Sequence, residues 1–246
     1  MSLSGKVFLI TGASKGIGRA TALRVAADGA SVVINYLSDS KAADAVVSTI
    51  GPDRALAVQA DVSKIPDIEK LVAAAVQKFG KIDVVVPNAG VMGMASLEHV
   101  SEEFFDRHFD LNVKGALFLV QKAVPHVPSG GRVILFSTGL TTATGVTPGY
   151  LVYAATKGAV EQLTRVLSKE LAGRGITVNA VAPGPTATEL FFEGKPQSVV
   201  DMITKQSPFS RLGTPEDIAG VVAFLAGEES RWVSGQVVRV NGANMV

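Results

Sequence analysis

The sequence predicts a doubly wound α/β fold, a parallel sheet with helices on both faces, and three observations support this prediction. Short apolar runs rich in β-branched residues alternate with helical patterns along the whole 246-residue chain. Most of these runs are apolar throughout, which is typical of parallel strands buried on both faces. We see no linker, low-complexity segment or internal repeat, so we expect residues 1–246 to form a single domain.

The predicted elements alternate in order along the chain. Seven strands are expected, at Lys6–Thr11, Ser31–Tyr36, Ala55–Ala60, Asp83–Pro87, Arg132–Ser137, Ile176–Val181 and Gln236–Val240. Helices are expected between them, at Gly16–Asp28, Lys41–Ile50, Pro66–Phe79, Ser101–Val124, Leu151–Ala172 and Thr214–Ala226. Glycines 29, 80 and 173 stand where helices should stop, and Thr214 begins the capping pattern TPED.

One long region, Pro183 to Pro208, has no regular pattern. Loops of this length are usually functional, so residues 184–208 are a candidate substrate lid. The region carries an apolar patch at Leu190, Phe191 and Phe192. This patch could close on a hydrophobic substrate, contact another subunit or pack locally.

The composition excludes several classes of function. Apolar residues make up 47% of the chain and charged residues 18%, with a net charge of +1, so neither nucleic acid nor an anionic membrane is an expected partner. Cysteine is absent and the three histidines lack a ligand spacing, so we expect no metal site. The first apolar run is too short for a signal peptide, and no run approaches the length of a membrane span. We therefore expect a soluble, cytoplasmic protein.

A glycine-rich turn, TGASKGIG from Thr11 to Gly18, follows the first strand and opens the first helix. Gly12 permits a tight turn, Gly16 lets the backbone approach a pyrophosphate, and Gly18 allows close packing of helix on strand. The helix N-terminus offers free N–H groups to the phosphates. The pattern predicts a dinucleotide site that also includes Ser14, Lys15 and Ile17; the alternative is an ordinary strand–helix turn.

The end of the second strand distinguishes the two nicotinamide dinucleotides. A site for NAD usually has Asp or Glu here to bind the ribose 2′-hydroxyl. This chain instead has Asn35, Tyr36 and Ser38, with its first carboxylate at Asp39. Lys15 adds a positive charge that suits a 2′-phosphate, although it could also be a solvated loop charge. The sequence therefore favours NADP(H).

Two tyrosines and a lysine lie close together in PGYLVYAATK. Tyr153 and Lys157 are four residues apart, so on a helix they share a face and can point into one cleft. Tyr150 is offset by three more residues, at or before the start of the helix. Either the pair is an acid with its tuning cation, or the stretch is an amphipathic helix with a packed tyrosine.

Together with the glycine turn, the stretches PNAG, LNVKG and YAATK resemble, in order and spacing, the short-chain dehydrogenase/reductase family nearly from end to end. The resemblance implies a Rossmann fold with a seven-stranded parallel sheet, usually in a homotetramer (or a homodimer), and hydride exchange between a nicotinamide and a carbonyl or alcohol. Asn88, Ala89 and Gly90 are retained and would line the cofactor ribose, whereas Pro87 replaces a second asparagine common in the family. The chain is most similar to β-ketoacyl carrier-protein reductases, glucose dehydrogenases and fungal hydroxynaphthalene-type polyketide reductases.

The resemblance also implies roles for individual residues. Tyr153 would be the general acid/base, with its pKa brought toward neutrality by Lys157 and by the nicotinamide charge. Lys157 would also hold the nicotinamide ribose. Asn112 would anchor a water that links the lysine to solvent, although by itself it could be a structural hydrogen-bonder.

The position of the hydroxyl that would bind the substrate oxygen depends on the end of the loop from which it is counted. Counted from the fifth strand it falls on Thr138, with Ser137 just before it; counted back from Tyr153 it falls near Leu140, which has no hydroxyl. Strand ends are fixed by the sheet while loops absorb insertions, so we predict Thr138.

Further cofactor contacts are implied by the stretch APGPTATEL and by the end of the third strand. The expected residues are Pro183, Gly184 and Thr186 at the nicotinamide, Thr188 at the pyrophosphate, and Asp61 and Val62 at the adenine. Taken singly, each could equally be a turn or a strand-end cap.

The expected function is therefore reduction of a ketone by NADPH, or oxidation of the corresponding secondary alcohol. Leu190–Phe192 and Tyr150 favour a hydrophobic or ring-bearing small-molecule substrate. The alternatives are a non-catalytic NADP-binding sensor and an NAD-preferring sugar or polyol dehydrogenase of the same family.

Overall fold

Seven parallel strands form one sheet in the computed structural model, which describes residues 2–245. The strand order is β3-β2-β1-β4-β5-β6-β7, and every neighbouring pair is parallel. The strands are β1 Val7–Ile10, β2 Ser31–Tyr36, β3 Ala55–Gln59, β4 Val84–Val86, β5 Arg132–Phe136, β6 Thr177–Pro183 and β7 Val237–Val240. The predicted fold class is confirmed, and the strand bounds differ from those predicted by at most two residues.

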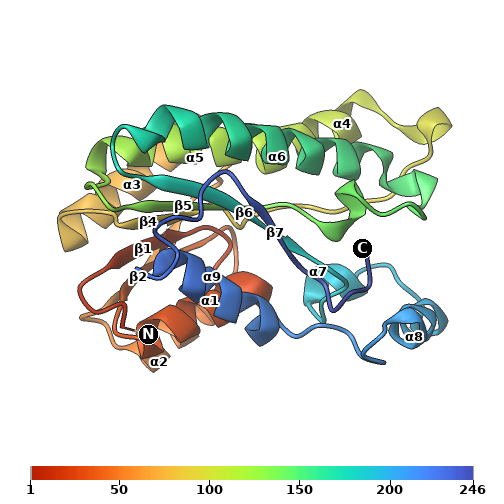
Figure 1. The fold of residues 1–246 in the computed structure, drawn as a ribbon, viewed down its shortest axis with the longest axis horizontal. Coiled ribbons are helices and arrows are strands. Elements are labelled where there is room, and N and C mark those ends of the chain that lie inside the picture. The colour runs from red at the N-terminus through yellow and green to blue at the C-terminus, as the bar shows by residue number, and fades with distance from the viewer. Residues whose placement is uncertain (1, 246) are drawn as a thin grey trace.

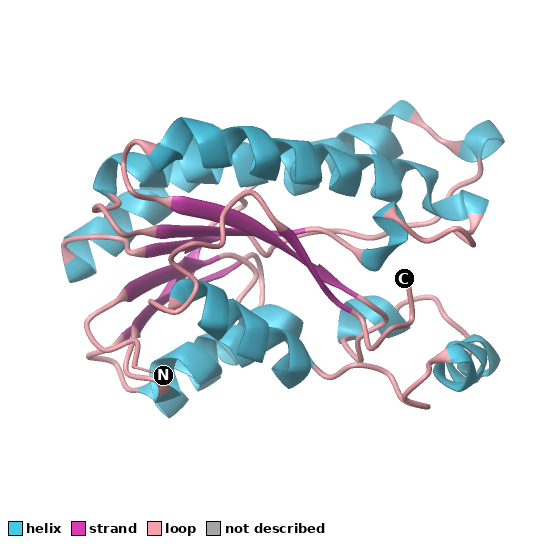
Figure 2. Ribbon diagram, viewed as in Figure 1, coloured by secondary structure: helices cyan, strands magenta, loops and turns pink. Residues whose placement is uncertain are grey.

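Helices cover both faces of the twisted sheet (Figures 1 and 2). One layer contains α1 Gly16–Ala27, α2 Ser40–Ile50 and α9 Pro215–Ala226; the other contains α3 Ile65–Phe79, α4 Glu102–Phe109, α5 Ala116–Ala123 and α6 Leu151–Ala172. Each layer buries its own apolar cluster against the sheet. Alternate residues of β1 show this division, because Phe8 and Ile10 belong to one cluster and Leu9 to the other.

The helix predicted over Ser101–Val124 is interrupted in the structure. A π-helical turn, Asp110–Gly115, separates α4 from α5. Such turns widen a helix locally and are frequent at functional sites. Here the wide turn carries Asn112, whose side chain bonds to the backbone of Val91 beyond β4.

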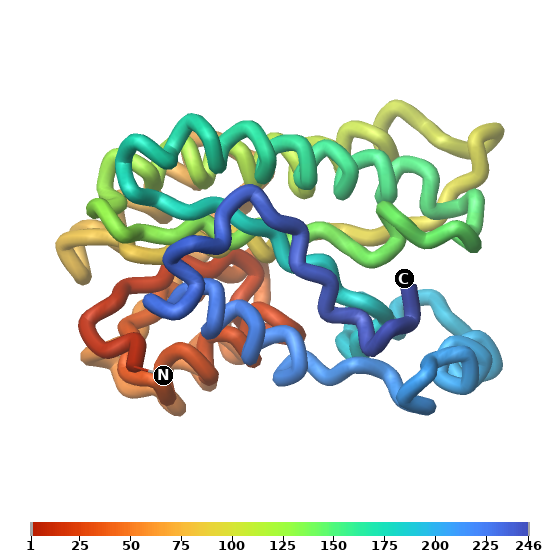
Figure 3. The backbone as a smooth tube through the Cα atoms, viewed as in Figure 1, coloured from red at the N-terminus to blue at the C-terminus, as the bar shows by residue number. Residues whose placement is uncertain are grey.

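The region predicted to be irregular, Pro183 to Pro208, contains two helices. These are α7, Glu189–Phe192, and α8, Gln197–Gln206. Thr188 caps the first, because its hydroxyl oxygen accepts a hydrogen bond from the N–H of Phe191. Both helices lie beyond the carboxyl ends of β6 and β7, beside the C-terminal segment of the chain (Figures 1 and 3).

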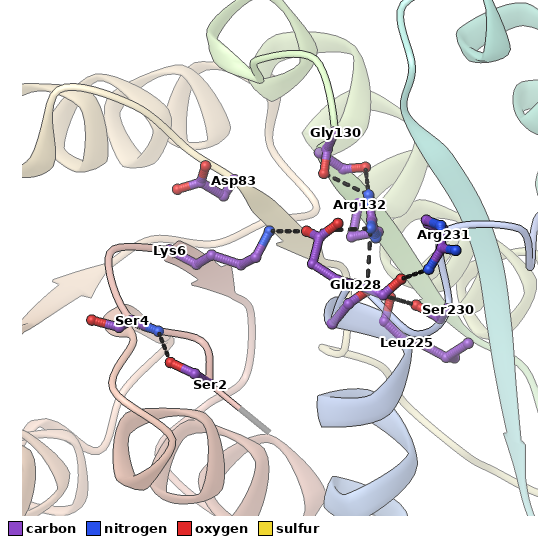
Figure 4. A network of polar contacts seen from close by, with 12 residues as sticks. Ser2, Ser4, Lys6, Asp83, Gly130, Arg132, Leu225, Glu228, Ser230 and Arg231 are labelled. Atoms are coloured by element: carbon purple, nitrogen blue, oxygen red, sulfur yellow. Dashed lines mark hydrogen bonds and ion pairs between the residues drawn. The ribbon is translucent and has the colours of Figure 1, made fainter.

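A buried arginine joins several segments at the amino edge of the sheet (Figure 4). Arg132, the first residue of β5, donates to the carbonyl oxygens of Gly130 and Gly131, and its Nη2 donates to that of Gly227 at 3.1 Å. Glu228 Oε1 lies 3.9 Å from the same Nη2 and 3.4 Å from Lys6 Nζ. This network ties β5 to the end of α9 and to the segment before β1.

The opposite, carboxyl edge of the sheet carries the switch in strand order. The connection from β1 leads to β2 on one side, and the connection from β4 leads to β5 on the other side. Ligands of open α/β sheets bind in the crevice that this reversal creates. The glycine turn and the start of α6 both lie at this edge. Among residues 2–245 no helix is long and apolar enough to cross a membrane.

Candidate active site

The turn between β1 and α1 has the geometry of a phosphate cradle. Gly12 and Gly16 adopt left-handed φ angles of 61° and 55°. A Cβ atom on Gly18 would lie 2.4 Å from the Gly12 carbonyl oxygen, so only glycine fits there. The N-terminus of α1 has no capping side chain and no acidic residue in its first turn, whereas α2 and α9 are capped by Asp39 and Thr214. The N–H groups of α1 are therefore available to an anion.

Two asparagines hold this turn in place. Asn35 Oδ1 accepts from the Gly12 N–H at 3.2 Å, and its Nδ2 donates to backbone oxygens of β2 and β3. Asn88 Nδ2 donates to the carbonyl oxygens of Thr11 and Gly12, at 2.7 and 3.2 Å. Their predicted contacts with the cofactor stay predictions. In the structure their side chains brace the cradle, and the pleat of β2 turns Asn35 inward, where it is 2% exposed.

The residues expected near a 2′-phosphate lie at the surface. Lys15 and Ser38 are exposed, and Tyr36 is half-buried at the end of β2. The first carboxylate after this strand, Asp39, accepts a hydrogen bond from the Ala42 N–H at 3.0 Å and serves as the N-cap of α2. The surface that directly follows β2 thus offers the neutral side chains Leu37 and Ser38 before this capping carboxylate.

The end of β3 forms a second wall beside the cradle. Asp61 Oδ1 accepts from the N–H and the hydroxyl of Ser63, at 3.0 and 2.7 Å, and caps the turn. Val62 is buried, and its carbonyl oxygen would lie 2.4 Å from a Cβ atom on Gly115. The expected adenine wall is therefore packed directly against the π-helical turn.

Tyr153 and Lys157 project from the first turns of α6 toward the end of β5. Lys157 is buried, and its Nζ donates to the Phe136 carbonyl oxygen at 2.9 Å and lies 5.8 Å from the centre of the Tyr153 ring. The structure thus brings together the predicted pair.

Burial shifts the pKa values of this pair in opposite directions. Burial raises the pKa of the Tyr153 phenol to about 12; the Thr138 side chain opposes this rise and nearby Tyr150 adds to it. Burial lowers the pKa of the Lys157 ammonium to about 8. The predicted shift of Tyr153 toward neutrality includes the charge of a bound nicotinamide and stays a prediction, whereas burial by the protein alone disfavours the phenolate.

Tyr150 shares the cleft but has different neighbours. It ends a 3₁₀ turn just before α6, and its ring centre lies 6.2 Å from that of Tyr153. Burial raises the pKa of this phenol too. Met94, in the segment after β4, packs against the adjoining Gly149, where a Cβ atom would lie 2.9 Å from its methyl carbon.

The two hydroxyls at the end of β5 point in different directions. The Thr138 side chain faces Tyr153 and also accepts from the Leu140 N–H at 3.4 Å. The Ser137 hydroxyl donates to Glu161 Oε1 on α6 at 2.8 Å. Adjacent residues of an extended strand face opposite sides, which accounts for this divergence. The geometry favours Thr138 over Ser137 as the residue that faces the cleft.

Asn112 joins three elements around the pair. Its Oδ1 accepts from the Val91 N–H at 2.9 Å, and its Nδ2 donates to the Val91 carbonyl oxygen and to Thr156 Oγ1, at 3.0 and 3.1 Å. Thr156 in turn donates to the Tyr153 carbonyl oxygen at 2.7 Å. The side chain expected to anchor a water is therefore engaged by the protein itself, and it fixes α6 relative to the end of β4.

The segment after β6 closes the crevice opposite the cradle. A Cβ atom on Gly184 would lie 2.8 Å from Asn241 Cα, and the Thr186 hydroxyl donates to the Gly184 carbonyl oxygen at 2.9 Å. Thr188 lies against the cradle, since its Cγ2 would be 3.5 Å from a Cβ atom on Gly16. Pro183, the last residue of β6, is half-buried.

The apolar patch of the candidate lid is only half-covered. Phe191 and Phe192 meet edge to face with ring centres 5.4 Å apart, and Lys195 Nζ donates to the Phe191 carbonyl oxygen at 2.7 Å. Leu190 and Phe192 remain exposed. Within residues 2–245 no group of His, Asp or Glu side chains has the arrangement of a metal site.

Sequence reasoning missed one side chain of this site, Glu161. It lies one helical turn beyond Lys157, and the four-residue spacing was the available signal. Its partners, Ser137 and Thr141, come from a loop whose path depends on tertiary structure.

Known proteins resemble the chain over almost its full length. A family model described as enoyl-(acyl carrier protein) reductase matches residues 12–243. An uncharacterized oxidoreductase of Methylorubrum extorquens is 47% identical over 244 residues, 98% of either chain. A hydroxynaphthalene reductase-like protein of Metarhizium majus is 41% identical over 258 residues, 99% of this chain and 96% of that protein. The solved structure of an angucycline C-6 ketoreductase with bound NADP matches with a TM-score of 0.92 and 38% identity, over 99% of this chain and 97% of that one.

These matches show that the chain belongs to the short-chain dehydrogenase/reductase family of oxidoreductases. The resemblance inferred from the sequence motifs is confirmed.

Proposed function

We propose that this protein reduces a ketone with NADPH, or oxidises the corresponding secondary alcohol with NADP. The observation that carries the proposal is the convergence of Tyr153, Lys157 and Thr138 at the carboxyl edge of the sheet, beside a glycine cradle that can hold a dinucleotide. A sensor of the dinucleotide would have no need of a tyrosine phenol and a buried lysine in the same crevice.

The raised pKa of Tyr153 suits an acid that works in ketone reduction. With a pKa of about 12, the phenol is protonated at neutral pH and has a proton to give to the developing alkoxide. Bound NADPH would supply the hydride. Thr138 would hold the carbonyl oxygen as negative charge grows on it, and Lys157 would hold the ribose hydroxyls of the nicotinamide half.

The cradle residues fit a phosphorylated dinucleotide. The free N–H groups of α1 suit the pyrophosphate, and exposed Lys15 and Ser38 suit a 2′-phosphate. In sites for NAD, an acidic residue at the end of the second strand binds the free 2′-hydroxyl. Here the first carboxylate after that strand, Asp39, caps α2. The ketoreductase with bound NADP, 38% identical, supports the same preference.

The substrate class is inferred from the walls of the cleft. Tyr150 and Met94 offer aromatic and apolar surface near Tyr153, and the candidate lid carries the exposed apolar side chains Leu190 and Phe192. Two similar proteins carry names that refer to ring-bearing substrates, a hydroxynaphthalene reductase-like protein and an angucycline ketoreductase. We therefore propose a fused-ring or otherwise hydrophobic ketone.

The test is steady-state oxidation of NADPH and of NADH with a panel of ketones that runs from fused-ring ketones to sugars. We expect turnover with NADPH and hydrophobic ketones. Replacement of Tyr36 by Asp should move the preference toward NADH, because a carboxylate repels the 2′-phosphate and accepts from a free 2′-hydroxyl. A wild-type enzyme that prefers NADH and a polyol would support the sugar-dehydrogenase alternative, and binding without turnover would support a sensor.

A further inference from the structure

Glu161 is a half-buried carboxylate directly behind the proposed catalytic hydroxyl. It lies on α6 four residues after Lys157 and eight after Tyr153, so the three side chains leave the same face of the helix. That face packs against the end of β5, where Thr138 begins a short turn toward Thr141.

The carboxylate contacts residues on both sides of Thr138. Its Oε1 accepts from the Ser137 hydroxyl at 2.8 Å and from the Thr141 hydroxyl at 2.6 Å. Hydrogen bonds to an ionised acceptor are roughly twice as strong as neutral ones, so these contacts are strong anchors. One oxygen atom thereby holds the residue just before the catalytic threonine and the residue three positions after it.

Thr141 extends the link to the backbone of Thr138 itself. Its Oγ1 also lies 2.9 Å from the Thr138 carbonyl oxygen, so its single hydrogen is shared between two acceptors. The turn is therefore fixed at Ser137, at the Thr138 carbonyl and at Thr141. With these points held, the Thr138 side chain faces Tyr153.

We propose that Glu161 is a positioning residue for the reaction: it holds the turn that aims the Thr138 hydroxyl at the Tyr153 phenol and the substrate oxygen. This inference rests on the proposed function, because it assumes that Thr138 binds the carbonyl oxygen. Its physical basis is that a small displacement of a catalytic group raises the barrier steeply.

The test compares variants that remove or keep the acceptor. Glu161→Met removes it at similar length, and Glu161→Gln keeps an oxygen that both hydroxyls can reach. Glu170→Met, at an exposed position of the same helix, is the matched control. For each variant we would measure kcat and KM with a ketone that the wild type reduces, the Kd for NADPH, and the thermal midpoint.

We expect Glu161→Met to lower kcat roughly tenfold with the Kd for NADPH unchanged, a smaller loss than that from removing the Thr138 hydroxyl. Glu161→Gln should restore most of the rate, and Glu170→Met should match the wild type. In a Thr138→Val background, Glu161→Met should change kcat by less than about twofold, because residues acting through one group are not additive.

Other results would overturn the inference. One such result is a wild-type kcat in Glu161→Met. The other is that Glu161→Met lowers kcat as much in the Thr138→Val background as in the wild type, which would mean that Glu161 does not act through Thr138. If Glu161→Met does not fold, Ser137→Ala combined with Thr141→Val removes the same hydrogen bonds from the loop side and should give the same loss. A wild type that reduces no ketone defeats the proposed function together with this inference, whereas an active wild type with indifferent Glu161 variants defeats the inference alone.

Discussion

A buried cation lies at each end of strand β5, and the two cations differ in the number of their hydrogen-bond partners. At the amino end, the Arg132 guanidinium donates to three backbone carbonyl oxygens and lies near Glu228. At the carboxyl end, the Lys157 ammonium has three hydrogens, and the hydrogen bond found for it within residues 2–245 goes to Phe136. Burial lowers the pKa of both, to about 8 for Lys157.

The difference is the one expected between a structural cation and the ligand-binding lysine that we propose. Arg132 makes three hydrogen bonds that join chain segments, which stabilises the fold, although its buried Nε has no partner within residues 2–245. Lys157 is buried with spare capacity, and under-partnered buried groups in a cleft are typical of functional sites. The variants below are ordered by the size of the expected effect, and each can break or sharpen this comparison.

Tyr153→Phe should have the largest effect. It removes the transferable proton while the ring keeps its packing, so turnover should fall roughly a thousandfold or more with NADPH affinity nearly unchanged. Steady-state NADPH oxidation and a separate binding titration check this. Tyr150→Phe is the matched control and should be mild; if it abolishes turnover instead, Tyr150 is the acid.

Lys157→Met should change stability in a pH-dependent way. The lysine has a pKa of about 8 when folded and 10.5 in its ordinary state, so between these values the unfolded chain binds more protons and wild-type stability rises with pH. The variant should therefore be more stable than the wild type at pH 7, and this advantage should fade toward pH 10.5. By linkage, the pH-dependent part is about 3 kcal/mol at most.

Urea denaturation at several pH values measures that difference. Lys169→Met, at an exposed position of the same helix, controls for the loss of a positive charge. A wild type that gains no stability relative to Lys157→Met as the pH rises would mean that the buried ammonium is not strained.

Thr138→Val should lower kcat roughly a hundredfold, because it deletes a donor to the developing alkoxide and keeps the β-branched shape. Thr138→Ser should retain most activity. Ser137→Ala should be mild, since Glu161 still holds Thr141. The reverse order of effects in kcat would assign the role to Ser137.

Arg132→Met should affect stability and leave chemistry alone. Three carbonyl oxygens lose their donor, so the free energy of unfolding should fall by about 2 kcal/mol. The kcat and the Kd for NADPH should stay at wild-type values, because Arg132 lies at the opposite edge of the sheet. Arg165→Met, at an exposed position, is the control. A large loss of kcat in Arg132→Met would contradict the purely structural role of Arg132.

The sequence was a good guide wherever local pattern decides the structure. The helix Leu151–Ala172 was predicted with its observed bounds, and the four-residue spacing of Tyr153 and Lys157 was enough to place them together. The parallel sheet followed from the apolar runs, because strands buried on both faces need no polar side.

Prediction failed where tertiary contacts decide. The break at Asp110–Gly115 depends on bonds between Asn112 and Val91, which no local pattern reveals. Helix α8 was missed because Gly194 and Pro196 obscure its short amphipathic stretch. Glu161 was missed because its partners, Ser137 and Thr141, lie in a loop whose path depends on tertiary structure.

Gly115 and Val62 bring the π-helical turn into close contact with the wall at the end of β3. Glycine is needed because any Cβ atom would lie 2.4 Å from the Val62 carbonyl oxygen. The same π-helical turn carries Asn112, which fixes the helix of the catalytic pair through Thr156. One turn of backbone therefore contacts both the expected adenine wall, at Val62, and the helix that carries Tyr153 and Lys157, through Thr156.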